Sequence, residues 1–381
     1  MTSEFNLVKG FRDFSGKEAI KLAELKKIIV GTFDKYGFEP AETPIVEYEE
    51  FVKGENKQDE AVSDIFKLED RGKRKLALRY EFTFQLKRLM KNKKIPYKRY
   101  QIGPVFRDEP VSSNRLRQFS QADVDVIGSS IKEEAEILAL SDEILRNLQI
   151  KPLIFINNRK LLNEILDDNK VKEKNKLQVL REIDKYDKIP EKDLRNNLKK
   201  LNAESVLSSL KKGEKYFNKF ESYKEIISLI EYCKIYGLKV QFSPSVVRGL
   251  SYYNGSVFEI KTENIKETLI AGGSYKFENV QCTGISFGLE RISLIAKLDD
   301  ECEKYLIVSL NQDKEAINLA QKLRKKGEIV FVYYGKPSKA LDYANSYGFV
   351  KVIFVGQKEI ESGKFKVKDM KTGKESLMKS F

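Results

Sequence analysis

The pattern of the sequence changes three times along the chain, and these changes constrain the fold more than any single motif. Residues 1–155 alternate helix and strand patterns, residues 156–238 are rich in Lys, Glu and Leu, and strand patterns return over 239–298. Over 302–381, short strands alternate with amphipathic helices, which is typical of a βαβαβ domain with a largely parallel sheet. We therefore expect an α/β protein with one core built from 1–155 and 239–298, a mostly helical insertion at 156–238, and a separate C-terminal domain at 302–381.

Local patterns support this division. Residues 18–36 place Ile20, Leu22, Leu25, Ile28, Ile29 and Phe33 at helical spacing and end before Gly37, which predicts an amphipathic helix. YKRYQIGPVFRDE and QFSQADVDVIG are typical of strands, and the turn at VSSNRLR between them predicts an antiparallel pair.

Composition places the chain among globular proteins and raises the possibility of a polyanionic partner. Apolar residues make up 41% of it, no apolar run approaches the length of a membrane span, and the N-terminus lacks a signal-peptide pattern. We therefore expect a cytoplasmic protein with no membrane partner. The net charge of +13 favours a nucleic acid or another polyanion, although a Lys-rich solvated surface explains the same charge.

The sequence contains no histidine and only three cysteines, Cys233, Cys282 and Cys302. This composition excludes Ser-His-Asp and Cys-His triads, histidine general bases and histidine-ligated metals. Cysteines that are odd in number and widely spaced favour neither a disulfide framework nor a zinc site, so no metal site is predicted. The chemistry must therefore use Arg, Lys, Tyr, carboxylates, backbone groups or the substrate.

Arginines are the best candidates for holding phosphates, because the chain has no Walker-type glycine loop and no dinucleotide fingerprint after the first strand of its last domain. Bidentate, permanently charged arginines can replace such a loop. The candidates lie beside strand patterns and glycines: Arg107, Arg115, Arg117, Arg248 and Arg291. Taken singly, each is better explained as an ordinary surface or salt-bridge arginine, because arginine is mostly exposed.

Five segments together resemble the class II histidyl-tRNA synthetase family, in the order found there. YQIGPVFRDE with RLRQFSQADVDVIG resembles motif 2, TGISFGLERI resembles motif 3, and VVRGLSYYNGSVFEI is similar to the histidine-specific signature. LALRYEFTFQLKRLM and VKGFRDFSG resemble two further family segments. The resemblance spans residues 8–295 and favours the archaeal and eukaryotic branch, and the last 80 residues fit the anticodon-binding domain by pattern only.

The resemblance implies an ATP site. Arg107 and Arg248 would be the catalytic arginines at the α-phosphate, Glu109 would accept a hydrogen bond from the adenine amino group, and Phe119 would stack on the ring. Arg115 and Arg291 would clamp the outer phosphates. Fixed positive charge suits an in-line displacement at phosphorus, in which the protein does little covalent work.

The resemblance also implies a pocket for the amino acid histidine. The residues that would orient the substrate and receive its α-amino group are Glu81, Thr83, Gln121, Asp125 and Arg248. Tyr252, Tyr253 and Tyr275 would line the pocket for the imidazole ring of the substrate. Gly272 and Gly273 would let the backbone approach the substrate. Outside this motif, tyrosines at such spacing are more often part of a core.

The implied activity has two steps: ATP and L-histidine form histidyl-adenylate, and the histidyl group then passes to the 3′ end of tRNA(His). Mg²⁺ would arrive with ATP, and a phosphate oxygen of the adenylate would take the proton of the tRNA hydroxyl, so no protein histidine is needed. Base contacts are expected near Ser112 to Arg117 and in the C-terminal domain. A homodimer is implied by the family and by the apolar helix at 18–36.

Four positions depart from the family pattern. Ser251 and Ser274 replace the usual aspartate and arginine, and Ser120 and Asn158 stand where histidine is common. Avoidance of histidine throughout would let the enzyme be made when histidine is scarce. Two alternatives remain at this point: an inactive regulatory subunit of ATP phosphoribosyltransferase, and an RNA-binding module without chemistry. Neither alternative explains why the arginines and carboxylates occur together.

Overall fold

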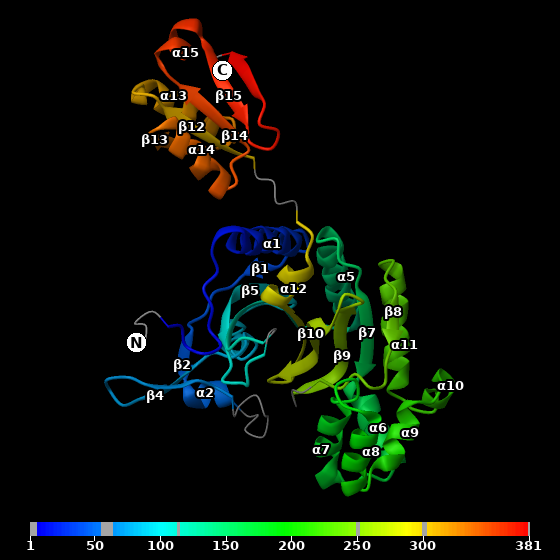
Figure 1. Cartoon of the computed structure of the whole chain (residues 1–381). Coiled ribbons are helices and arrows are strands. Elements are labelled where there is room, and N and C mark those ends of the chain that lie inside the picture. The colour runs from blue at the N-terminus through cyan, green and yellow to red at the C-terminus, as the bar shows by residue number, and fades with distance from the viewer. Residues whose placement is uncertain (1–5, 55–63, 113–114, 249–251, 299–302, 380–381) are drawn as a thin grey trace. The chain divides into compact units, whose positions relative to one another are not determined.

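The computed structural model describes residues 6–54, 64–112, 115–248, 252–298 and 303–379. The chain forms two compact units, Met1–Leu298 and Asp299–Phe381 (Figure 1). Each unit has its own apolar clusters, and each is described here by itself.

The first unit is built on a mixed eight-stranded sheet. In spatial order the strands are β1 (Glu39–Pro40), β5 (Tyr97–Phe106), β6 (Gln118–Ile127), β11 (Val280–Gly288), β10 (Ile265–Phe277), β9 (Tyr253–Thr262), β7 (Leu153–Asn158) and β8 (Val240–Phe242). The predicted antiparallel pairing of the segments around 97–109 and 118–128 is confirmed. The expectation of an antiparallel sheet holds for the middle strands, whereas the β1–β5 and β7–β8 pairs at the two edges are parallel.

Helices cover one face of this sheet. They are α1 (Gly16–Lys35), α5 (Ile131–Asn147), α11 (Tyr223–Ile235) and α12 (Leu289–Ile295), and their buried residues share one core with Val124, Phe258 and Ile285 of the strands. The predicted helix at 18–36 is confirmed as α1, but Ile20 does not join its buried face and is 41% exposed.

A small sheet lies beside the large one in the same unit. Its order is β2 (Val46–Tyr48), β4 (Lys75–Leu78) and β3 (Lys67–Glu69), and the short helices α2 (Glu49–Lys53) and α4 (Leu86–Leu89) follow β2 and β4 in sequence. The turn between β4 and α4 carries several of the predicted substrate residues.

The predicted helical segment contains α6 (Arg159–Asp168), α7 (Glu173–Ile183), α8 (Glu191–Lys200), α9 (Glu204–Leu210), α10 (Glu214–Phe217) and α11. It begins at Arg159 rather than at residue 156, because β7 continues to Asn158. The Asn158 side chain then accepts a hydrogen bond from the backbone N–H of Lys160 at 2.8 Å and caps α6. α11 contacts α5, so these helices share the core of the first unit instead of forming one of their own.

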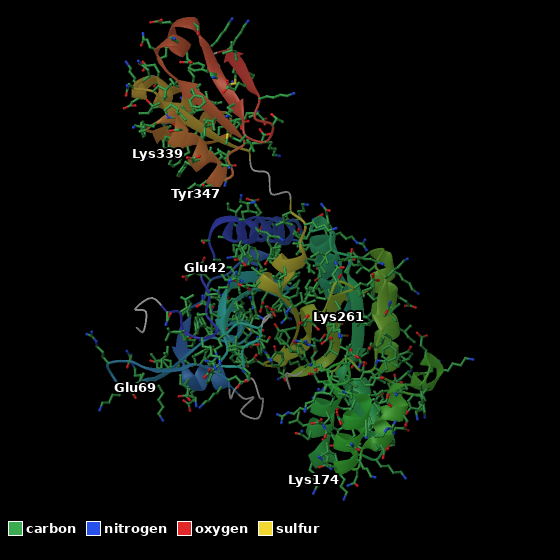
Figure 2. The ribbon with its side chains drawn as sticks, viewed as in Figure 1. Glu42, Glu69, Lys174, Lys261, Lys339 and Tyr347 are labelled. Carbon is green, nitrogen blue, oxygen red and sulfur yellow. The ribbon has the colours of Figure 1, made fainter. Side chains whose placement is uncertain are left out.

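The second unit is a five-stranded sheet with helices on both faces. The order is β13 (Ile329–Tyr334), β12 (Lys304–Ser309), β14 (Lys351–Val355), β15 (Lys364–Asp369) and β16 (Glu375–Lys379), with α13 (Asp313–Lys325), α14 (Pro337–Ser346) and α15 (Gln357–Ser362) between them. The first three strands are parallel, as predicted, and β15 and β16 form an antiparallel hairpin at the end of the sheet. Lys339 and Tyr347, in α14 and just after it, are exposed (Figure 2).

Candidate active site

The candidate site lies on the face of the large sheet opposite the helices, which we call the site face. Strand β6 shows how the sequence creates it. Ala122, Val124 and Val126 pack into the core beneath the helices. Because side chains alternate along a strand, Gln121, Asp123 and Asp125 project to the site face.

Asp125 is the centre of a buried polar cluster. Arg99 lies opposite it in the register of β5 and β6, and its guanidinium Nη2 is 2.6 Å from Asp125 Oδ2. Tyr275 donates a short hydrogen bond to Asp125 Oδ1. Arg99 is 0% exposed and also donates to the Phe82 carbonyl oxygen at 3.1 Å. Burial nevertheless raises the pKa of Asp125, with Arg99 and Tyr275 opposing that rise.

Two more buried carboxyl groups accompany Asp125. The pKa of Glu81 is raised to about 8, mainly by burial and also by the nearby carboxylates of Asp123 and Asp125, while Arg107 opposes the rise. Burial also raises the pKa of Asp123 to about 7, although the Ser286 hydroxyl donates to it at 2.6 Å. Tyr252 donates to Glu81 Oε2 at 3.3 Å, while Oε1 of Glu81 accepts no hydrogen bond of good geometry from the described residues. A cationic ligand would therefore be favoured here.

Aromatic rings stand beside these carboxyl groups. The rings of Tyr252 and Tyr253 have centroids 4.8 Å apart, and those of Tyr252 and Tyr275 are 5.7 Å apart and edge-on. Thr83 is buried in the turn after β4, near the start of α4. The tyrosines combine flat apolar surfaces with hydroxyl groups, which is the chemistry needed to hold a flat polar ring.

Glycines allow these strands to approach so closely. A Cβ at Gly284 would lie 2.1 Å from Asp125 Oδ1, and one at Gly272 would lie 2.0 Å from the Gly284 carbonyl oxygen. A Cβ at Gly273 would lie 2.8 Å from the Tyr253 ring. We expected Gly272 and Gly273 to let the backbone approach the substrate. In the structure, Gly272 instead lies close to the adjacent strand and Gly273 close to the Tyr253 ring. Both glycines therefore serve the close packing of the sheet.

The predicted arginines also come together. Burial lowers the pKa of Arg291, Glu267 opposes this, and the positive charges of Arg115, Arg107 and Arg248 lower it further, so all four guanidinium groups lie within electrostatic range. Arg107 lies over the Phe119 ring, 5.1 Å from its centroid, and donates to the Tyr80 carbonyl oxygen at 3.3 Å. The same Arg107 acts on Glu81 and Asp123, so the cationic and acidic groups belong to one site.

Two of these arginines are paired with carboxylates. Arg248 Nη1 lies 3.1 Å from Glu259 Oε1, and the Arg248 backbone has φ of 64°, a conformation rare for a side chain of this size. Arg115 forms a close ion pair with Glu109, so two residues expected to contact different parts of ATP contact each other. Arg117 instead pairs with Asp108 at 3.0 Å. Binding of a polyphosphate here would compete with these carboxylates for the arginines.

Sequence reasoning missed four residues that shape this site: Arg99, Asp123, Gly284 and Ser286. A signal was present for one of them, because the alternation in QFSQADVDVIG already places Asp123 on the face of Asp125. The roles of Arg99 and Gly284 depend on the register of β5, β6 and β11. This register pairs residues of different segments, so it cannot be deduced from any one of them.

Three of the departures from the family pattern have local partners. Glu290 accepts hydrogen bonds from the Ser120 backbone N–H at 2.8 and 2.9 Å. The Ser274 hydroxyl donates to Glu134, and the Asn158 amide donates to Glu225 at 2.7 Å. Ser251 lies outside the described residues.

In the described part of the chain, no helix is long and apolar enough to cross a membrane, and no group of three or more Cys, Asp or Glu side chains is placed to hold a metal ion. The sequence contains no histidine that could supply a further ligand.

Comparison with known families gives two matches that together span most of the chain. Residues 10–292 match the profile of the family described as histidyl-tRNA synthetase, and residues 304–380 match the profile described as anticodon binding domain.

Relatives and solved structures agree with these matches. A protein of Shouchella clausii named histidine–tRNA ligase 2 is 32% identical, with 98% of this chain and 97% of the relative covered. A histidine–tRNA ligase of Methanocaldococcus jannaschii is also 32% identical, with the same coverage of both chains. The expected archaeal and eukaryotic branch is not tested by these similarities.

Among solved structures, histidyl-tRNA synthetase from Nostoc sp. PCC 7120 superposes with a TM-score of 0.85 at 24% identity, covering 99% of this chain and 97% of that one. A Bacillus halodurans structure described as an ATP phosphoribosyltransferase regulatory subunit/histidyl-tRNA synthetase superposes with a TM-score of 0.79 at 22% identity, covering 93% of this chain and 99% of that one. At these identities the superpositions show the fold.

Proposed function

Because the chain belongs to the histidyl-tRNA synthetase family, as its 10–292 and 304–380 matches show, we propose that its site face activates L-histidine with ATP and transfers it to tRNA(His). The observation that carries this proposal is the pairing of two unlike groups of side chains on one sheet face. Buried carboxyl groups of Glu81, Asp123 and Asp125 adjoin the cluster of Arg107, Arg115, Arg248 and Arg291.

The carboxyl groups supply the site for the α-ammonium group of histidine. A buried carboxylate is costly without a cation, and the raised pKa values of Glu81 and Asp123 express that cost. An arriving ammonium group offsets it and favours the ionised form. A substrate without this group would leave the carboxyl groups unpaired, which is the basis of strong discrimination.

The tyrosines supply the site for the imidazole ring. The Tyr252 ring contacts two others: its centroid lies 4.8 Å from that of Tyr253 and 5.7 Å from that of Tyr275. The hydroxyl groups of these tyrosines can donate to or accept from the ring nitrogens. Gln121 is buried on the site face, and its Oε1 accepts no hydrogen bond of good geometry from the described residues.

The arginines supply the site for the ATP phosphates. In the first step, a carboxylate oxygen of histidine attacks the α-phosphorus, the bond to the bridging oxygen breaks, and pyrophosphate leaves with the bonding electron pair. Arg107 and Arg248 would stabilise the charge that develops on the α-phosphate, and Arg115 and Arg291 would hold the outer phosphates. Phe119, which already lies beneath the Arg107 guanidinium, would stack on adenine, and Glu109 would accept from its amino group.

In the second step, a terminal hydroxyl of tRNA attacks the histidyl carbonyl carbon and AMP leaves. The proton of that hydroxyl would pass to a phosphate oxygen of the adenylate, so the absence of histidine from the sequence does not block the reaction. The described residues include no group of three or more carboxylate or thiol side chains placed to hold a metal ion. Mg²⁺ would be carried by the ATP phosphates.

The second unit and the subunit state complete the proposal. The match to an anticodon-binding domain supports contact of residues 304–380 with tRNA, and Ser112 to Arg117 remain the expected contacts near the site. We expect a cytoplasmic homodimer. The apolar residues Leu25, Ile29 and Phe33 of α1 are buried in the subunit's own core, so they do not themselves supply a dimer contact. Exposed Ile45, Val46, Tyr48 and Leu68, in and beside the small sheet, support a subunit contact instead.

The test is histidine-dependent exchange between ATP and labelled pyrophosphate. We expect exchange with histidine and with no other amino acid, and a decrease of at least about a hundred-fold in Arg248→Ala, because removing one preorganised donor to developing charge has that effect. Arg195→Ala is the matched control, since Arg195 forms surface ion pairs with Glu191 and Glu204 on α8 and nearby.

Two results would contradict the proposal. Lack of exchange with any amino acid would favour the regulatory-subunit alternative, which the superposition with the Bacillus halodurans structure keeps structurally reasonable. Equal exchange in Arg248→Ala and Arg195→Ala would show that Arg248 does not act at the α-phosphate.

A further inference from the structure

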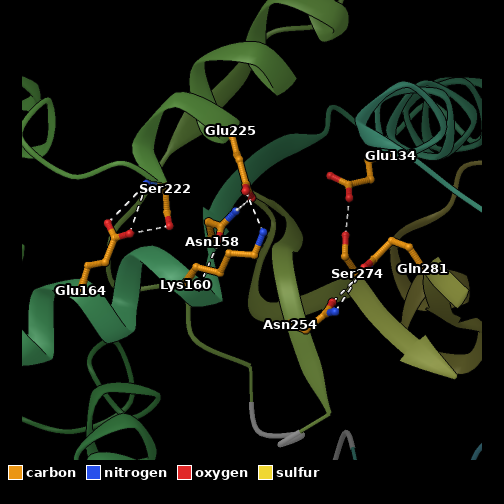
Figure 3. A network of polar contacts seen from close by, with 9 residues as sticks. All are labelled: Glu134, Asn158, Lys160, Glu164, Ser222, Glu225, Asn254, Ser274 and Gln281. Carbon is orange, nitrogen blue, oxygen red and sulfur yellow. Dashed lines mark hydrogen bonds and ion pairs between the residues drawn. The ribbon is translucent and has the colours of Figure 1, made fainter. Parts of the chain in front are cut away.

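A second cavity lies on the other side of the sheet from the candidate active site. It has a volume of about 460 Å³ and is bounded by the start of α5, by α6 and α11, and by strands β9, β10 and β11. Most of the residues that line it have polar side chains, and Figure 3 shows contacts among several of them. The proposed function makes no use of it.

Glu134 is the unusual group in this cavity. It lies in the first turns of α5, is only 5% exposed, and accepts a short hydrogen bond from the Ser274 hydroxyl through Oε1. Its Oε2 accepts no hydrogen bond of good geometry from the described residues. Burial raises its pKa to about 7, while the hydroxyl groups of Ser256 and Ser274 oppose the rise. A carboxyl group in this position is poorly compensated by its own protein.

Two sets of polar groups around the cavity are already paired. Glu225 accepts from the Asn158 amide and from the Lys160 ammonium, each at 2.7 Å. Asn254 and Gln281 exchange hydrogen bonds at 3.2 and 3.1 Å (Figure 3). The charge of Lys160 lowers the pKa of Glu134, but the Lys160 ammonium is paired with Glu225. Lys132 is exposed, and among the described residues neither lysine forms an ion pair with Glu134.

The shape and charge of the cavity select the class of ligand. The volume of about 460 Å³ is much larger than a single water or bare metal ion needs. A guanidinium group stays charged when it is buried, and its planar fork pairs with a carboxylate through two parallel hydrogen bonds. Serine hydroxyls and amide oxygens around Glu134 can accept its remaining N–H groups.

We propose that this cavity is a binding site for a small guanidinium compound, with the guanidinium group on the carboxylate of Glu134. The site is separate from the candidate active site. Ser274 and Tyr275 are consecutive in β10, yet Ser274 contacts Glu134 on the helix side whereas Tyr275 contacts Asp125 on the site face. The proposal does not depend on the aminoacylation function.

The experiment uses the full chain and methylguanidinium chloride as the probe, with methylammonium chloride at the same concentrations as the comparison cation. Saturation-transfer NMR titration and calorimetric Tm would be measured. In the wild type we expect saturable binding of methylguanidinium, a rise in Tm, and weaker binding of methylammonium, which lacks the fork. In Glu134→Gln, which keeps the side-chain shape without the charge, binding should weaken by at least about ten-fold.

Two further variants distinguish a binding site from a general effect. Glu164→Gln is the matched control, because Glu164 accepts from Ser222 at 2.7 Å and does not line the cavity, so it should bind like the wild type. Ser274→Arg would place a tethered guanidinium beside Glu134 and should raise Tm and abolish the response to the probe. Non-saturable behaviour in the wild type, which indicates a cavity filled by water only, or equal binding by Glu134→Gln and the wild type would overturn the proposal.

Discussion

At the scale of single residues, the candidate site depends on carboxyl groups held where they are costly to ionise. Glu81, Asp123 and Asp125 are all below 9% exposed, and burial is the largest cause of the raised pKa of each. Arg99 compensates Asp125 directly, whereas Glu81 has only a long hydrogen bond from Tyr252 at 3.3 Å. Glu81 is therefore the residue whose ionisation should be most visible in the free protein.

This predicts a pH dependence of stability. The pKa of Glu81 is raised from 4.5 to about 8 in the folded protein, so its contribution to stability is complete below pH 4.5 and is lost as the pH rises through about 8. Within that window the unfolded chain binds fewer protons, so the free energy of unfolding falls with pH, by at most about 1.4 kcal/mol per pH unit for one group. In Glu81→Gln the fall should be shallower.

The measurement is urea unfolding of the wild type and Glu81→Gln between about pH 5 and 8. Glu221→Gln is the control, because the Glu221 side chain is 80% exposed and pairs only with Lys224 at the surface. Parallel pH profiles for Glu81→Gln and the wild type would show that Glu81 does not hold its proton in the folded state.

At the scale of elements, the site depends on how closely β10 and β11 approach their neighbours. Gly284 lies opposite Asp125 in the register of β11 and β6, and Gly272 lies opposite Ile285 in that of β10 and β11. The missing side chain at 284 leaves the room that the Asp125 carboxylate occupies. The strand spacing and the position of the carboxylate are thus set by the same residue.

We predict that Gly284→Ala destabilises the protein by about 1–3 kcal/mol and weakens histidine binding, because its Cβ would lie 2.1 Å from Asp125 Oδ1. Urea unfolding and the KM for histidine in pyrophosphate exchange would be measured. Gly213→Ala is the matched control, since no atom lies within 4 Å of its added Cβ and its φ is −69°. Equal effects of the two substitutions would contradict the proposed packing of Asp125 against β11.

At the scale of the whole molecule, two units with separate cores share one chain of net charge +13. The net positive charge suits the proposed partner, tRNA, which is a polyanion. The small substrates, in contrast, are proposed to bind in a buried site. Phosphate contacts release counterions and weaken steeply with salt, whereas buried contacts are screened much less.

The two reactions should therefore respond differently to salt. Between about 50 and 200 mM KCl, we expect the KM for tRNA in aminoacylation to rise by about ten-fold or more. The KM for histidine in pyrophosphate exchange, measured in the same buffers, should change much less and serves as the control. A KM for tRNA that does not change over this range would show that the excess of positive charge does not contact the tRNA backbone.

The sequence by itself determined the order of the elements and supplied most of the residues that we propose for the site. Helical spacing located α1, alternation located β5 and β6, and the change in pattern after residue 298 located the second unit. These features are local, because the periods of a helix and a strand are written in adjacent residues. The arginines and the residues of the expected histidine pocket likewise lie in short segments that could be compared with a family.

Only the tertiary structure decided which of these groups meet. The pairing of Arg99 with Asp125, the need for Gly284, and the unpartnered carboxylate of Glu134 depend on strands and helices far apart in the sequence. Glu134 illustrates the reason, because the helical pattern of α5 predicts a solvated glutamate at the start of a helix. Its burial follows from the packing of α5 against β10 and α11, and the energy of a charge depends on that environment more than on its neighbours in sequence.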